Sequence, residues 1–98
     1  MFERNYMKTT IQSLHFTPVE KLNDFLTEKL NELEQAYPAI KTGIACLKLD
    51  KTEKVDNKIC EIKIEIPGYN LYVKKQLPTF EEAIEQAVEA LEKEISKH

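Results

Sequence analysis

The chain has 98 residues, and its 14 lysine and arginine residues against 17 aspartate and glutamate residues give a formal net charge of −3 at pH 7. This length suits one small domain with a modest core, and the charge excludes a uniformly basic nucleic-acid-binding domain. No apolar run approaches the ~18 residues of a membrane span, and the N-terminus lacks the apolar core of a signal peptide. We therefore expect a cytoplasmic protein that does not bind a membrane. Residues 1–6 are predicted to be a disordered extension, and residues 7–98 a single domain.

The first two predicted elements are a strand and an amphipathic helix. Residues 7–14 alternate as a short strand does. Thr17 is a suitable helix N-cap, Pro18 suits the first helical position, and Glu20 completes a capping box. Pro38 ends the helix. Steps of three and four residues predict one buried stripe, made of Val19, Leu22, Phe25, Leu26, Leu30, Leu33 and Tyr37.

Three strands and a second helix follow. The strands are predicted over residues 43–49, 59–66 and 71–76, with a polar connection over residues 50–58 and a turn over residues 67–70. Alternation in the middle strand places four residues inward, Cys60, Ile62, Ile64 and Ile66. Thr79 and Glu82 form a second capping box. The buried stripe of the last helix is predicted to be Phe80, Ala83, Ile84, Ala87, Val88, Leu91 and Ile95.

This β-α-β-β-β-α order predicts an α+β fold. The one-sided strands and amphipathic helices fit a two-layer sandwich, in which a four-stranded mixed sheet carries both helices on one face. The first two strands are expected to be parallel and joined by a right-handed helical crossover, and the last three to form an antiparallel meander.

The residue types that carry catalysis or bind metals are sparse. Strand alternation places Cys46 away from the helices and Cys60 in the core, so the two thiols cannot meet disulfide geometry. The two histidines, His15 and His98, lie far from both cysteines in sequence, and no zinc-type cluster forms. Two glycines cannot build a phosphate loop, and no nucleophile or metalloprotease motif occurs. We therefore predict no enzyme, no metal, no cofactor and no small-molecule substrate.

Charge is divided unevenly along the chain. The helical segments 17–37 and 79–98 carry −3 and −4, and the remaining residues carry +4. One stripe of the last helix, at i,i+4 spacing, consists of Glu81, Glu85, Glu89, Lys93 and Lys97. This order suits the helix dipole and by itself explains the stripe structurally. The functional interpretation is that Lys93 and Lys97 form a basic tip that meets phosphates, with Lys74 and Lys75 as a second patch.

Three stretches of the sequence carry a resemblance to a known family. They are Met7–Ile11 with the helix Thr17–Tyr37, then Leu47–Leu49 before a polar hairpin, and Thr79–Glu85 followed by Leu91–His98. Together they resemble the ribosome hibernation promoting factor family, also called ribosome-associated inhibitors or ribosomal subunit interface proteins. The third stretch is the most specific, because the last helix of the family ends in a similar Leu-x-Arg/Lys-x-Leu-x-Lys-His pattern.

The resemblance implies a fold related to double-stranded-RNA-binding domains. It also implies a protein that binds the small ribosomal subunit in the channel for messenger and transfer RNA, inhibits translation by occupancy, and idles ribosomes under stress or in stationary phase. The chain looks like the short form, without the C-terminal domain that pairs two ribosomes. The expected rRNA-binding residues are Lys29, Lys74, Lys75, Lys93, Lys97 and His98.

Some positions depart from the family pattern. Asn23 and Glu32 stand where members often carry arginine or lysine, and Glu94 replaces a common glutamine. These departures predict a weaker or a more localised phosphate contact.

Two other interpretations compete with ribosome binding. The acidic helices could dock a basic protein, or the sheet face away from the helices, with Ile44, Cys46 and Tyr72, could form a dimer. A sheet-face RNA binder is the third interpretation, but Tyr72 is the one aromatic placed there, and that mode stacks bases on several.

Overall fold

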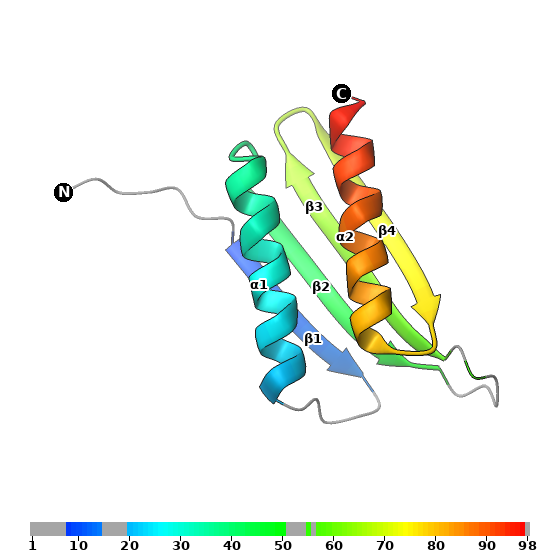
Figure 1. Ribbon diagram of the computed structural model, residues 1–98. Helices are drawn as coiled ribbons and strands as arrows, with labels where there is room; N and C mark the ends of the chain where they lie inside the picture. Colours follow the sequence, from blue (N-terminus) through cyan, green and yellow to red (C-terminus); the bar gives the residue numbers. More distant parts are fainter. Residues whose placement is uncertain (1–7, 15–19, 51–54, 56, 98) are drawn as a thin grey trace.

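A computed structural model of the chain describes residues 8–14, 20–50, 55 and 57–97. Its elements are β1 (Lys8–Leu14), α1 (Glu20–Ala36), β2 (Thr42–Leu49), β3 (Lys58–Ile66), β4 (Tyr69–Leu77) and α2 (Phe80–Ser96). The two helices lie side by side across one face of the sheet, with their C-terminal ends at the same end of the molecule (Figure 1). The predicted α+β class and element order are confirmed.

The strands follow the order β1-β2-β3-β4 across the sheet. β2, β3 and β4 form an antiparallel meander, and β1 pairs with β2 in parallel, with Lys8 opposite Thr42 and Leu14 opposite Lys48. A parallel pair needs a crossover connection, which α1 supplies. Within the described residues β4 pairs with one neighbour alone, so it is an edge strand.

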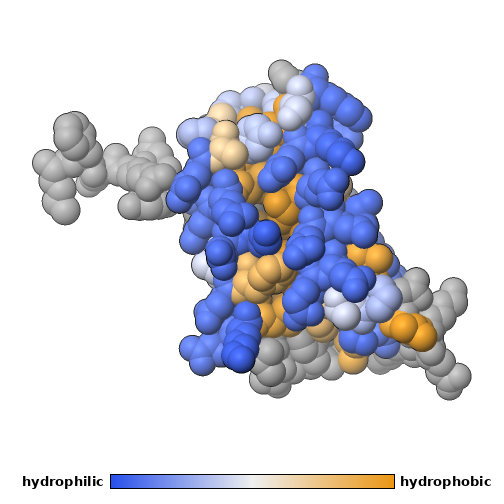
Figure 2. All heavy atoms as spheres, in the orientation of Figure 1, coloured by the Kyte–Doolittle hydropathy of each residue, from blue (hydrophilic) through white to orange (hydrophobic). Residues whose placement is uncertain are grey.

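The core lies between the sheet and the helices. The inward residues of β3 are buried as predicted, and so are the central residues of both helical stripes, namely Leu22, Leu26, Leu30, Leu33, Ala83, Ile84, Ala87, Val88 and Leu91. Phe25, Tyr37, Phe80 and Ile95 are partly buried against this core. Figure 2 shows the consequence on the helix side, where hydrophilic outer surfaces flank an apolar seam between the helices.

Local signals set several element ends. The Glu82 backbone N–H donates to Thr79 Oγ1 at 3.1 Å, which confirms Thr79 as the N-cap of α2. The turn before β4 is tighter than predicted: Ile66 already pairs with Tyr69, so Pro67 and Gly68 alone make it. Gly68 adopts φ +95°, which glycine reaches without the strain of a side chain. The predicted extension over residues 1–6 and the cap at Thr17 and Pro18 lie outside the described residues.

The face of the sheet opposite the helices is called the open face here. Cys60 is opposite Leu47 and faces the helices, while Cys46 is opposite Glu61 on the open face. Both thiols are free and on opposite sides, as predicted. Cys46 is only 8% exposed, however, so its expected place in an accessible dimer patch is wrong. Burial raises the pKa of its thiol, and the neighbouring Lys48 opposes that shift.

Candidate functional site

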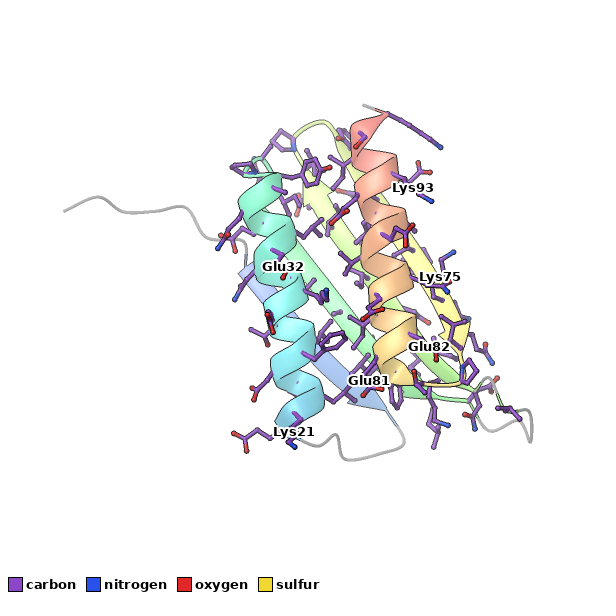
Figure 3. All side chains as sticks on the ribbon, viewed as in Figure 1. Lys21, Glu32, Lys75, Glu81, Glu82 and Lys93 are labelled. Carbon is purple, nitrogen blue, oxygen red and sulfur yellow. The ribbon has the colours of Figure 1, made fainter. Side chains whose placement is uncertain are left out.

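A groove runs between β4 and the C-terminal half of α2. It has a volume of about 1070 Å³, and its charged lining consists of Lys74, Lys75, Lys93, Lys97, Glu89, Glu92 and Glu94. Figure 3 shows Lys75 on β4 and Lys93 on α2 on the same side of α2, toward the β4 edge. We call this site the β4–α2 groove.

The groove unites lysines that the sequence placed in two patches. Lys93 is in the last turn of α2 and Lys97 is the C-cap of that helix, and α2 packs against β4 and β3. This packing brings both lysines to the same groove as Lys74 and Lys75. The two predicted patches are therefore parts of one groove, which the sequence did not indicate because the helix and the strand are separate elements.

Lys74 and Lys75 approach the groove from opposite faces of the sheet. Lys74 is opposite Glu61 on the open face, and Lys75 is opposite Cys60 on the helix side. Successive residues of a strand always separate in this way. Both reach one groove because β4 is at the edge of the sheet, where a ligand has access to the two faces at once.

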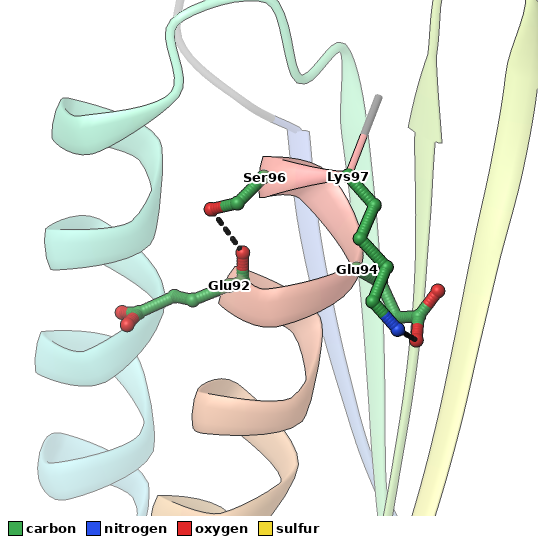
Figure 4. A network of polar contacts seen from close by, with 4 residues as sticks. All are labelled: Glu92, Glu94, Ser96 and Lys97. Carbon is green, nitrogen blue, oxygen red and sulfur yellow. Dashed lines mark hydrogen bonds and ion pairs between the residues drawn. The ribbon is translucent and has the colours of Figure 1, made fainter.

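Lys93 and the C-cap Lys97 both have carboxylate partners on α2. Lys93 Nζ lies 3.4 Å from Glu89 Oε1, which confirms the predicted i,i+4 pair, and the two side chains are 71% and 65% exposed. Lys97 Nζ lies 3.3 Å from Glu94 Oε1, as Figure 4 shows. Exposed pairs of this kind contribute about 0–1 kcal/mol. The ammonium groups can therefore exchange these partners for phosphate at little cost.

Ser96 makes two contacts at the end of the groove, one within α2 and one to Tyr37. The Ser96 hydroxyl donates to the Glu92 carbonyl at 2.8 Å (Figure 4), and the Tyr37 and Ser96 hydroxyl oxygens lie 3.3 Å apart. Tyr37, the residue after α1, therefore contacts the last residue of α2 beside Lys97. The sequence placed Tyr37 in a buried stripe and gave no sign of this contact.

Of the other two predicted site residues, only Lys29 is within the described part of the chain. Lys29 is on α1, with Nζ 5.6 Å from the Phe25 ring centroid and 3.7 Å from Glu32 Oε2. It is absent from the groove lining, and Glu32 offsets its charge. His98 lies outside the described residues. The structure thus brings four of the six predicted residues together.

Tyr72 also lines the groove and was not among the predicted binding residues. It was expected on the open face, where it does lie, 58% exposed. The missing signal was that β4 is an edge strand, because only at an edge does an open-face side chain also border a helix-side groove.

Among the described residues, no group of three or more histidine, cysteine, aspartate or glutamate side chains is placed to hold a metal ion. Neither α1 nor α2 is both long and apolar enough to cross a membrane.

Two solved structures share this fold. A ribosomal subunit interface protein from Coxiella burnetii superposes with a TM-score of 0.81 at 15% identity, covering 93% of this chain and 96% of that one. The N-terminal domain of Thermus thermophilus Protein Y gives a TM-score of 0.75 at 18% identity, covering 94% and 97%.

The sequence comparisons give a family. No curated protein sequence matches the chain. The profile of the family described as Sigma 54 modulation protein / S30EA ribosomal protein matches residues 9–98. The predicted resemblance is confirmed, and the chain belongs to the Sigma 54 modulation protein / S30EA ribosomal protein family.

Proposed function

We propose that this protein is a ribosome-associated translation inhibitor of the hibernation type. It binds the small ribosomal subunit in the channel for messenger and transfer RNA, in the cytoplasm, and idles ribosomes under stress or in stationary phase. It acts by occupancy, without chemistry or a cofactor. The observation that carries this proposal is the gathering of four lysines in the β4–α2 groove of a chain from this family.

The overall acidity of the chain is compatible with an rRNA partner. Phosphate contact needs positive charge at particular points, not a positive total. The groove offers four ammonium groups from two elements, two of them in weak exposed ion pairs. Its three glutamates confine the positive surface to these points, so the contact is local and sensitive to position.

Replacing Lys93 and Lys97 together by glutamate tests this role. We expect the double variant to co-sediment less with ribosomes from stationary-phase cells, because repulsion replaces attraction at two phosphate contacts. The measurement is gradient sedimentation, followed by detection of the protein in the ribosomal fractions. A thermal melt checks the fold, since each new carboxylate on α2 costs about 0.2–0.5 kcal/mol where it faces another at i,i+4 spacing.

A matched control separates position from total charge. Lys21→Glu with Lys41→Glu makes the same charge change at two exposed lysines outside the groove. The proposal is supported if this control co-sediments with ribosomes as the wild type does while the groove variant co-sediments less. Equal sedimentation of wild type and groove variant would remove Lys93 and Lys97 from the site.

A further inference from the structure

A row of side chains crosses the open face and ends at the β4–α2 groove. Ile44 is opposite Lys63, and Lys63 is opposite Tyr72. Ile44 is 44% exposed and Tyr72 58%, and they account for two of the three exposed large hydrophobic residues in the described part of the chain. We call Ile44, Lys63 and Tyr72 the open-face row. Tyr72 belongs both to this row and to the groove lining.

The surroundings of Tyr72 favour an anionic ligand. Lys63 is beside it in the row, Lys74 follows it on the same face of β4, and Lys75 lies across the strand edge. Two acids also lie on the open face. The charge of Glu61 is offset by Lys48, whose Nζ lies 2.8 Å from Glu61 Oε1, whereas Glu65 accepts a hydrogen bond from the Thr42 hydroxyl at 3.1 Å and keeps its charge.

The Tyr72 ring is suited to stacking. Its pKa is raised, first by partial burial and then by the negative charge of Glu61, so the phenol is neutral at physiological pH. A neutral aromatic ring with an exposed face, next to lysines, is the arrangement with which proteins bind single-stranded nucleic acids. In a duplex the base faces are stacked on one another, and proteins contact it through phosphates and 2′-hydroxyls. A duplex therefore offers no base that could stack on such a ring.

We propose that the β4–α2 groove binds a single RNA strand, with one unpaired base stacked on Tyr72 and the flanking phosphates held by lysines of the groove and of the open-face row. One aromatic side chain corresponds to one base, in contrast to sheet-face binders that stack several. The inference rests on the proposed function and deepens it, since it names the kind of RNA that this site recognises.

Binding of a labelled oligouridine of about ten nucleotides tests the inference, with an RNA duplex of equal length as the comparison. Fluorescence anisotropy is measured with the full chain. We expect Tyr72→Ala to weaken oligouridine binding about five-fold to a hundred-fold. Tyr72→Phe keeps the ring face and retains binding. Binding of the duplex is the same in all variants.

Two further variants act as controls. Tyr72→Leu preserves an apolar side chain without an aromatic face, so its loss of binding reports stacking even if the alanine variant is unstable. Val55→Ala truncates another exposed hydrophobic residue, 79% exposed and outside the groove lining, and leaves binding unchanged.

Several outcomes would overturn the inference. One is oligouridine binding that is the same in wild type, Tyr72→Leu and Tyr72→Ala. Another is that Tyr72→Ala weakens binding of the duplex and of the single strand by the same factor. A dimer that Tyr72→Ala dissociates would assign the open-face row to a second copy of the chain. In each of these cases the lysine dependence of ribosome sedimentation can stand, so the proposed function fails only by its own test.

Discussion

Cys46 and Cys60 lie on neighbouring strands, yet their side chains have different surroundings. The two-residue period of a strand assigns them to opposite faces from the sequence, and the register confirms it. Exposure does not follow from the period. Cys46 is buried although it lies on a face expected to be open. The face to which a strand residue points is a local property, whereas its exposed fraction depends on neighbouring strands that are distant in sequence.

Ionisation of Cys60 is expected to lower the free energy of unfolding at alkaline pH. Burial raises the pKa of its thiol from 9.0 to about 12. The folded state therefore binds the thiol proton more tightly than the unfolded state does. The contribution of this protonated thiol to the free energy of unfolding is complete below pH 9 and is lost as the pH rises from 9 toward 12. We expect Cys60→Val, which has no thiol to ionise, to lose less unfolding free energy than wild type between about pH 8 and pH 11. Urea denaturation at the two pH values measures this, and identical losses would contradict it.

At the scale of elements, α2 is the best determined part of the chain. Its N-cap, its acidic first turn and its basic last turn all come from residues close in sequence, and the structure contains each of them. The turn at Pro67 and Gly68 was predicted too long, because β4 pairs as far as Tyr69. Strand ends depend on pairing with a partner strand, which propensity alone does not determine.

The cap at Thr79 gives a prediction for α2. Thr79→Ala removes the acceptor of the Glu82 N–H and is expected to lower the unfolding free energy by about 1 kcal/mol. Thr79→Ser keeps a hydroxyl acceptor and should retain most of the stability. Urea denaturation of the three proteins measures the difference. An alanine variant as stable as wild type, or a serine variant as unstable as alanine, would show that the hydrogen bond is not the cause.

At the scale of the whole molecule, the function depends on where charges meet. The helices carry −7 in the sequence segments that contain them, yet two of their lysines and two from β4 share one groove. Lys29 and Lys93 both match basic positions of the family pattern, but Lys29 lies on α1 beside Glu32 and not in the groove lining. Sequence resemblance identified basic positions, and packing decided which of them act together.

Salt dependence measures how many lysines act together. If all four groove lysines contact phosphates, the logarithm of the oligouridine binding constant should fall with that of salt concentration with a slope of roughly −3, at about −0.7 per contact. Lys93→Gln with Lys97→Gln should reduce the slope by about 1.4 units. Anisotropy titrations at several salt concentrations give both values. An unchanged slope in the variant would show that these two lysines are not in phosphate contact.

The sequence by itself determined the elements of this protein, the inward faces of its strands and helices and its family. These depend on periodicity, caps and residue order, which act over a few residues at a time. Only the tertiary structure decided that β4 is an edge strand and that α2 packs beside it. The groove arises from that packing: Lys74 and Lys75 point to opposite faces, and they join Lys93, Lys97 and Tyr72 only where the sheet ends.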